Sequence, residues 1–174
     1  HTKSADCAAV LACALSRVSM SGMSCTRWNA VAEKMQHTFG RQALPIVWDF
    51  AEVVVTADAP GNWKSGYELI SEVIETSRSC GAGQTQLADA TEHPLPDDAA
   101  HVCFTDPPYY DAVPYAYLSD FFYVWMRRTL ADIHPALFRE AGVPKDAEIV
   151  VDRPHQLSKS TKDIAFYERE LTRA

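Results

Sequence analysis

Four consecutive residues, Asp106, Pro107, Pro108 and Tyr109, combine two hydrogen-bond acceptors with an aromatic ring. The Asp106 carboxylate is one acceptor, and the Pro107 carbonyl is the second, because proline loses its backbone N–H but keeps its C=O. Each proline restricts its own φ and biases the preceding residue to extended geometry, so both acceptors are held in place before a ligand arrives. We call residues 106–109 the DPPY corner.

The DPPY corner suits chemistry on a planar amino group. The lone pair of an exocyclic amine is delocalised into its ring, so its nitrogen is a poor nucleophile until it becomes pyramidal. Two acceptors that each take one N–H favour that geometry. Tyr109 offers a flat face on which a base pulled out of a duplex can stack, worth on the order of 1–3 kcal/mol. The alternative is an ordinary Asp-Pro-Pro turn with Tyr109 at the edge of a core. We favour the chemistry.

The elements around the corner must place it. A nearly continuous apolar run, residues 99–105, precedes it and predicts a parallel strand covered on both faces. Open α/β sheets hold their ligands at the carboxyl ends of such strands. Apolar residues at helical spacing over residues 118–130 predict a helix directly afterwards. The order strand, loop, helix therefore predicts an α/β fold in which helices flank parallel strands.

The rest of the chain supplies further elements. Composition and periodicity predict a buried helix over residues 6–18, a surface helix over 63–79 and a last helix capped by Ser160 or Thr161. Apolar runs predict strands over 44–55, 85–88 and 149–151. For residues 27–42 the sequence pattern favours neither a helix nor a strand. With 174 residues, 47% of them hydrophobic, the chain is expected to form a single domain, residues 1–174.

The tetrapeptide resembles the catalytic motif of amino-methyltransferases, and Asp in first place resembles the adenine type. A longer string, FTDPPYYDAVPYAYLSDFFYVWMRR over residues 104–128, resembles a family of large, little-characterised prokaryotic DNA methylases linked to phage defence. The string FGRQALPIVWDFAE over residues 39–52 is similar to the middle region of that family. The resemblance covers residues from about 11 to 128. Three further residues match this family, but their chemistry suggests no particular role: Trp28, Trp48 and Asp49.

The resemblance implies a Rossmann-like methyltransferase that uses S-adenosylmethionine and acts on the amino group of an adenine flipped out of double-stranded DNA. It also implies association with other subunits of a defence system. Its site residues would be Asp106, Pro107, Pro108 and Tyr109 for catalysis, Asp89 and Phe104 beside the cofactor, and Tyr110 and Asp111 beside the substrate base. For Asp89 an Asx turn is an equal alternative, and Tyr110 and Asp111 can equally be loop residues.

The glycine-rich motif that cradles the methionine part of the cofactor does not occur in this sequence. Gly81-Ala82-Gly83 follows a helical pattern instead of an apolar strand, so its context does not fit that motif. Because the chain also starts at His1 without Met, we expect a fragment of a longer polypeptide, inactive in isolation. Related corners methylate RNA adenines or glutamine amides, and a non-catalytic remnant that acts as an interaction module is the other alternative.

Charge and composition narrow the setting. A formal net charge of -7 means that any surface for DNA is local or supplied elsewhere. The five cysteines form no CxxC pair and the histidines are scattered, so no metal site is expected. No apolar stretch approaches the roughly 20 residues that span a bilayer, which predicts a cytoplasmic protein without membrane contact. Neither a DNA recognition sequence nor an oligomeric state is indicated.

Overall fold

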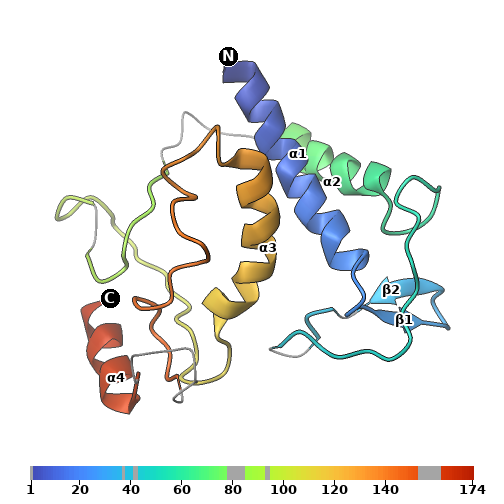
Figure 1. Ribbon diagram of the computed structural model, residues 1–174. Coiled ribbons are helices and arrows are strands. Elements are labelled where there is room, and N and C mark those ends of the chain that lie inside the picture. The colour runs from blue at the N-terminus through green and yellow to red at the C-terminus, as the bar shows by residue number, and fades with distance from the viewer. Residues whose placement is uncertain (1, 37, 41–42, 78–84, 93–94, 153–161) are drawn as a thin grey trace. The chain divides into compact units, whose positions relative to one another are not determined.

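The computed structural model describes residues 2–36, 38–40, 43–77, 85–92, 95–152 and 162–174. Its elements are α1 (Thr2–Ser21), β1 (Arg27–Asn29), β2 (Lys34–Gln36), α2 (Trp63–Thr76), α3 (Tyr115–Leu130) and α4 (Ile164–Arg173) (Figure 1). Contacts divide the chain into two compact units. The first comprises residues 1–80 and 118–143, and the second comprises residues 81–117 and 144–174. This division does not test whether residues 1–174 fold as a single domain, so the single-domain expectation stays a prediction.

The first unit is built on the packing of α1 against α2. Helix α1 buries Ala14 and Val18 on one side and Ala12 on another, whereas other residues of the same helix are exposed. Gly66 lets α2 approach closely, because a Cβ at this position would lie 2.7 Å from Val18 Cγ2. Asn62 caps α2, and its Oδ1 accepts the Ser65 N–H at 2.7 Å.

A short antiparallel hairpin follows α1, with Trp28 opposite Met35. The turn is closed by the Asn29 side chain, whose Oδ1 accepts the backbone N–H groups of Val31 at 3.0 Å and Ala32 at 3.1 Å. Such local bonds from an Asn side chain to the backbone are a common way to start a turn. The hairpin lies within residues 27–42, where the sequence pattern predicts neither helix nor strand.

Aromatic rings join the segment after the hairpin to α3. Phe39 lies 5.8 Å from Phe121 and 5.4 Å from Phe122, measured between ring centroids. Near the end of the first unit the Tyr123 hydroxyl donates to the Glu140 carbonyl at 2.8 Å. These contacts hold α3 to the segments on either side of it in sequence.

The second unit is held by residues at the start of α4. Lys162 is buried, and its Nζ donates to the carbonyls of Lys145 and, at 2.8 Å, of Glu148. The Lys162 carbonyl accepts the Asp152 N–H at 2.9 Å, and Glu148 Oε1 accepts the Ala116 N–H at 3.0 Å. The start of α3 and the start of α4 are thus tied to the same stretch, residues 145–152.

The predicted fold class is wrong. Among the described residues the only sheet is the two-stranded antiparallel hairpin, and the remaining elements are helices, so there is no parallel sheet of the Rossmann-like kind. Residues 44–55, 85–88 and 99–105 contain no strand, and residues 149–151 have none either. In the run before the DPPY corner Val102 is 80% exposed and Phe104 is 96% exposed. Apolar character indicated burial, but a strand also needs a paired neighbour, which these segments lack.

The helix predictions fare better. Those over residues 6–18, 63–79 and 118–130 are confirmed as helices, in the middle of α1, in α2 and in most of α3. The expected burial of the first helix is wrong, since most of α1 is exposed or half-buried, and α2 ends earlier than predicted, at Thr76. The last helix is confirmed too, with Asp163 as its cap: Asp163 Oδ1 accepts the Phe166 N–H at 2.8 Å. Ser160 and Thr161, the predicted caps, lie outside the described residues. In the part of the chain that the structure describes, no helix is both long and apolar enough to cross a membrane.

Candidate functional site

The DPPY corner borders a hollow of about 250 Å³ in the second unit, lined by Asp106, Pro107, Pro108, Tyr109 and Tyr115. Tyr109 is 74% exposed, so its ring is free to meet a ligand. Asp106 and Pro107 are exposed as well, and Pro108 is half-buried. The corner follows a segment that belongs to no strand, so the expectation that it lies at the carboxyl end of a sheet strand is wrong.

Three successive carbonyl groups of this loop have hydrogen-bond donors. The Pro108 carbonyl accepts the Tyr167 hydroxyl at 2.7 Å, and the Tyr109 carbonyl accepts the Ala112 N–H at 2.8 Å. The Tyr110 carbonyl accepts the Val151 N–H at 2.9 Å. The backbone after Pro107 is therefore used for structure.

The two acceptors that the predicted chemistry needs are not used in this way. Among the described residues, neither the Asp106 carboxylate nor the Pro107 carbonyl has a hydrogen-bond donor, and Asp106 forms no ion pair. Both residues line the hollow beside Tyr109. The corner thus combines an exposed ring with two acceptors that are vacant among the described residues, on residues that line the same hollow.

The two residues proposed beside the substrate base do not line this hollow. Tyr110 has a φ of 31°, in the left-handed region that bulky residues rarely adopt, and its ring packs edge-on against Tyr167 at 5.4 Å. Asp111 is exposed. The structure therefore places Tyr110 in the support of the corner, and it brings neither residue to the hollow.

The two residues proposed beside the cofactor are also away from the hollow's lining. Asp89 Oδ1 accepts both the backbone N–H and the hydroxyl of Thr91 at 2.8 Å, the hydrogen bond of an Asx turn. The backbone N–H bond from Thr91 is the main reason that the pKa of Asp89 is lowered. Phe104 is exposed. The structure thus places Asp89 in a local turn and Phe104 at the surface, and their place beside the cofactor stays a prediction.

Sequence reasoning missed two tyrosines of this site. Tyr115, the first residue of α3, lines the hollow, although the sequence pattern predicts no role for it. Tyr167, on α4, reaches the corner from 59 residues further along the chain. Tyr115 lies inside the string that resembles the methylase family, which is a signal that could have drawn attention to it. No such signal marks Tyr167.

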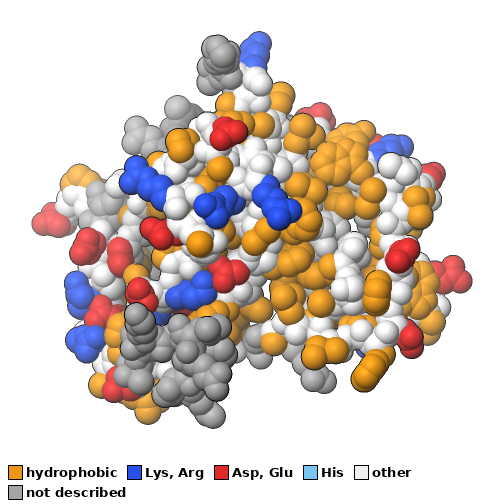
Figure 2. Space-filling view, in the orientation of Figure 1, with side chains coloured by type: hydrophobic (Ala, Val, Ile, Leu, Met, Phe, Trp, Pro, Cys, Tyr) orange, Lys and Arg blue, Asp and Glu red, His pale blue; other side chains and the backbone are white. Residues whose placement is uncertain are grey.

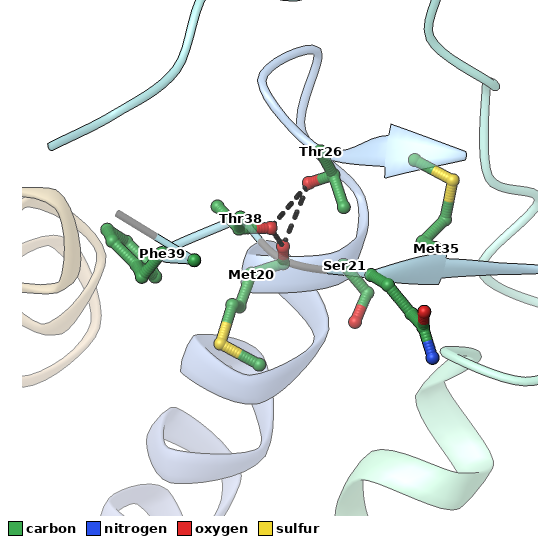
Figure 3. Close-up of a pocket in the computed structure, with 8 residues that line it drawn as sticks. Met20, Ser21, Thr26, Met35, Thr38 and Phe39 are labelled. Carbon is green, nitrogen blue, oxygen red and sulfur yellow. Dashed lines mark hydrogen bonds between the residues drawn. The ribbon is translucent and has the colours of Figure 1, made fainter. Parts of the chain in front are cut away.

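A second hollow, of about 280 Å³, lies in the first unit at the end of α1 (Figure 3). Its two threonine hydroxyls are already paired: those of Thr26 and Thr38 lie 2.7 Å apart, and they donate to the Met20 carbonyl at 3.1 Å and 2.6 Å. These hydroxyls close the carboxyl end of α1, whose last carbonyls lack helical partners. The arrangement is structural, and we assign it no chemistry.

No group of three or more potential metal ligands occurs among the residues that the structure describes. In comparisons with known proteins, no family model, no curated protein and no solved structure matches this chain. The resemblance to DNA methylases therefore rests on the quoted residues alone.

Proposed function

We propose that this chain carries the amine-binding corner of a methyltransferase that transfers a methyl group from S-adenosylmethionine to the exocyclic amino group of adenine in DNA. The observation that carries the proposal is the selective use of the corner's oxygens. The carbonyls of Pro108, Tyr109 and Tyr110 are paired, whereas the Asp106 carboxylate and the Pro107 carbonyl have no donor among the described residues. Those two are the acceptors that a planar amine requires.

In this proposal the base has to leave the duplex, because its amino group is paired inside it. The flipped ring stacks on Tyr109, and its two N–H groups donate to Asp106 and Pro107. Both hydrogen bonds favour a pyramidal nitrogen with an available lone pair. S-adenosylmethionine, when bound, would supply the methyl group and leave as the thioether, and the amine would release one proton to water. Catalysis consists of alignment, with no metal and no covalent intermediate.

The hollow matches the substrate in kind. Tyr115 lines it together with Tyr109, so two aromatic side chains border the space where the base would lie.

The net charge of -7 limits contact with the DNA backbone. In the second unit Arg169 and Arg173 are already paired with Glu170, at 2.7 Å and 2.9 Å. We therefore propose that base capture by the corner, rather than phosphate contacts of this unit, provides the specificity. The cytoplasmic location and the association with defence-system subunits belong to the same proposal.

The test is methyl transfer by the polypeptide as its gene encodes it, with tritiated S-adenosylmethionine and DNA, RNA and protein as acceptors. We expect label on adenine in DNA. Asp106→Ala removes one acceptor and should lower kcat by about 100-fold or more, in the range reported for loss of a group that acts in the transition state. Asp132→Ala, which removes another exposed carboxylate in the first unit, is the control and should leave kcat unchanged.

The outcomes separate the alternatives. Label on RNA adenine or on glutamine amides would keep the chemistry and change the substrate. Label on none of the three, from a polypeptide that binds S-adenosylmethionine by calorimetry, would refute the proposal. Full activity of Asp106→Ala would refute the role of the corner.

A further inference from the structure

We infer that Tyr167 is a positioning residue for the DPPY corner, holding Tyr109 and the two vacant acceptors in the geometry that receives the substrate amine. The inference deepens the proposed function and rests on it for its effect on activity. Its structural part concerns only contacts within the second unit.

Tyr167 contacts the residues on both sides of Tyr109. Its hydroxyl donates to the Pro108 carbonyl at 2.7 Å, and its ring packs edge-on against the Tyr110 ring at 5.4 Å and 68°. Tyr109 itself is mostly exposed. The direction of the Tyr109 ring therefore depends on how its two neighbours are held, and Tyr167 holds both.

The prolines make this hydrogen bond especially effective. The rings of Pro107 and Pro108 already restrict φ at both positions, so the remaining backbone freedom of the corner lies mainly in ψ. A hydrogen bond to the Pro108 carbonyl restricts ψ of Pro108, because it fixes the plane of the following peptide group. The bonds to the Tyr109 and Tyr110 carbonyls restrict the next two residues in the same way. With Tyr167 in place, the corner has little freedom left.

The helix that carries Tyr167 is itself anchored. Asp163 caps α4, and its carbonyl accepts the Tyr167 N–H at 3.1 Å. The preceding residue, Lys162, is buried and bonded to the carbonyls of Lys145 and Glu148. The Tyr167 hydroxyl is therefore presented from a fixed base, which is what a positioning residue requires.

The experiment compares two substitutions that each remove one tyrosine hydroxyl bound to a backbone carbonyl. Tyr167→Phe removes the bond to Pro108 and keeps the ring. Tyr123→Phe removes the bond to Glu140, 2.8 Å long, in the first unit. The loss of one such bond gives an expected change of about two- to tenfold in the affected equilibrium or rate. Both variants keep their rings, so both are expected to fold.

Two measurements are made on the full polypeptide. Amide hydrogen exchange at Ala112 and Val151, whose N–H groups bond to the carbonyls of Tyr109 and Tyr110, should be about two- to tenfold faster in Tyr167→Phe and unchanged in Tyr123→Phe. In methyl transfer to DNA, Tyr167→Phe should lower kcat by a similar factor and leave KM for DNA unchanged, because the bond acts on alignment. Tyr123→Phe should change neither.

Unchanged exchange at Ala112 and Val151 in Tyr167→Phe overturns the inference whether or not the protein is a methyltransferase. Unchanged kcat in an active enzyme also overturns it, and leaves the proposed function standing. A wild type that transfers no methyl group refutes the proposed function, and the exchange measurement still decides whether Tyr167 holds the corner.

Discussion

Lys162 brings a positive charge into the interior of the second unit, where it is 5% exposed. Its ammonium group donates to two backbone carbonyls, and the carboxylates of Glu148, Asp152 and Asp146 attract it. Burial outweighs this attraction, so the pKa of Lys162 lies below its ordinary value of 10.5. Folding therefore favours the neutral amine, which still has two N–H groups for the two carbonyls.

This pKa shift makes stability depend on pH in a known direction. At pH values below the folded pKa both states are protonated, and the folded state bears the full penalty of the buried charge. As pH rises through the folded pKa toward 10.5, the unfolded chain binds more protons than the folded chain, so the free energy of unfolding rises. We predict that the free energy of unfolding of wild type minus that of Lys162→Met, both measured by urea unfolding, increases as pH rises over this range.

Lys64→Met is the control for that measurement. Lys64 is exposed and lies 3.9 Å from Glu68, a surface pair that contributes little to stability. The difference between wild type and Lys64→Met should be flat over the same pH range. A Lys162→Met difference that is equally flat would contradict the prediction.

The sequence allowed part of the site to be predicted at the level of single residues. Asp106, Pro107 and Tyr109 could be found because acceptor, backbone restriction and ring are properties of residue types. Tyr167 could not, because its role is a contact across 59 residues, and a lone tyrosine on a helix has many uses. For Asp89 the sequence supports a cofactor contact and an Asx turn equally, and the structure shows the hydrogen bonds of the Asx turn.

At the scale of elements, the contact of α1 with α2 depends on one missing side chain. A Cβ at Gly66 would lie 2.7 Å from Val18 Cγ2. Val18 is buried and β-branched, so its side chain has few other rotamers to adopt. Close approach at this point explains a glycine inside a helix, where glycine is otherwise unfavourable by roughly 1 kcal/mol.

We predict that Gly66→Ala lowers the free energy of unfolding, on the order of 1 kcal/mol, because overpacking exceeds the gain in helix propensity. Gly22→Ala is the control: its Cβ would meet the Val18 carbonyl at an ordinary 3.4 Å. Combining Gly66→Ala with Val18→Ala should show a favourable coupling, since the smaller side chain removes the clash. Urea unfolding of five proteins, namely wild type, the single variants Gly66→Ala, Val18→Ala and Gly22→Ala, and the double variant, provides the measurement. A stabilised Gly66→Ala would refute the packing argument.

Helices were predictable and strands were not, for a physical reason. A helix satisfies its backbone hydrogen bonds within one segment, so the spacing of apolar residues over 63–79 or 118–130 was sufficient. A strand needs a neighbour from elsewhere in the chain, and residues 99–105 contain no information about one. The hairpin of β1 and β2 was missed for the opposite reason, because its strands are short and its signal lies in the Asn29 side chain.

At the scale of the whole molecule, large hydrophobic side chains are exposed in both units. On the face drawn in Figure 2, hydrophobic side chains lie at the surface beside charged ones. Trp48 is 95% exposed, and Val31, Ile46 and Leu87 are also largely exposed. The buried hydrophobic residues of the described chain are few and mostly small: Ala12, Ala14, Val18, Ala116, Leu130 and Val150. Little apolar surface is therefore removed from water by this chain alone.

This balance predicts how the 174-residue chain behaves in solution. We expect it to bind the hydrophobic dye ANS, as proteins with accessible apolar surface do. Its urea m-value should be lower than that of a compact chain of the same length, because m scales with the surface exposed on unfolding. Fluorescence titration with ANS and urea unfolding followed by circular dichroism test both points. A chain that does not bind ANS, and whose m-value equals that of a compact chain of the same length, would contradict the expectation.

At Tyr110 the left-handed backbone lowers stability, whereas the ring supports the corner, so selection for stability and selection for activity favour different residues. A residue other than glycine in this region costs about 1–2 kcal/mol, and a glycine there would remove that penalty. The same exchange would delete the ring that rests on Tyr167. Directed evolution for heat resistance would therefore enrich glycine at position 110, and directed evolution for turnover would retain the aromatic residue.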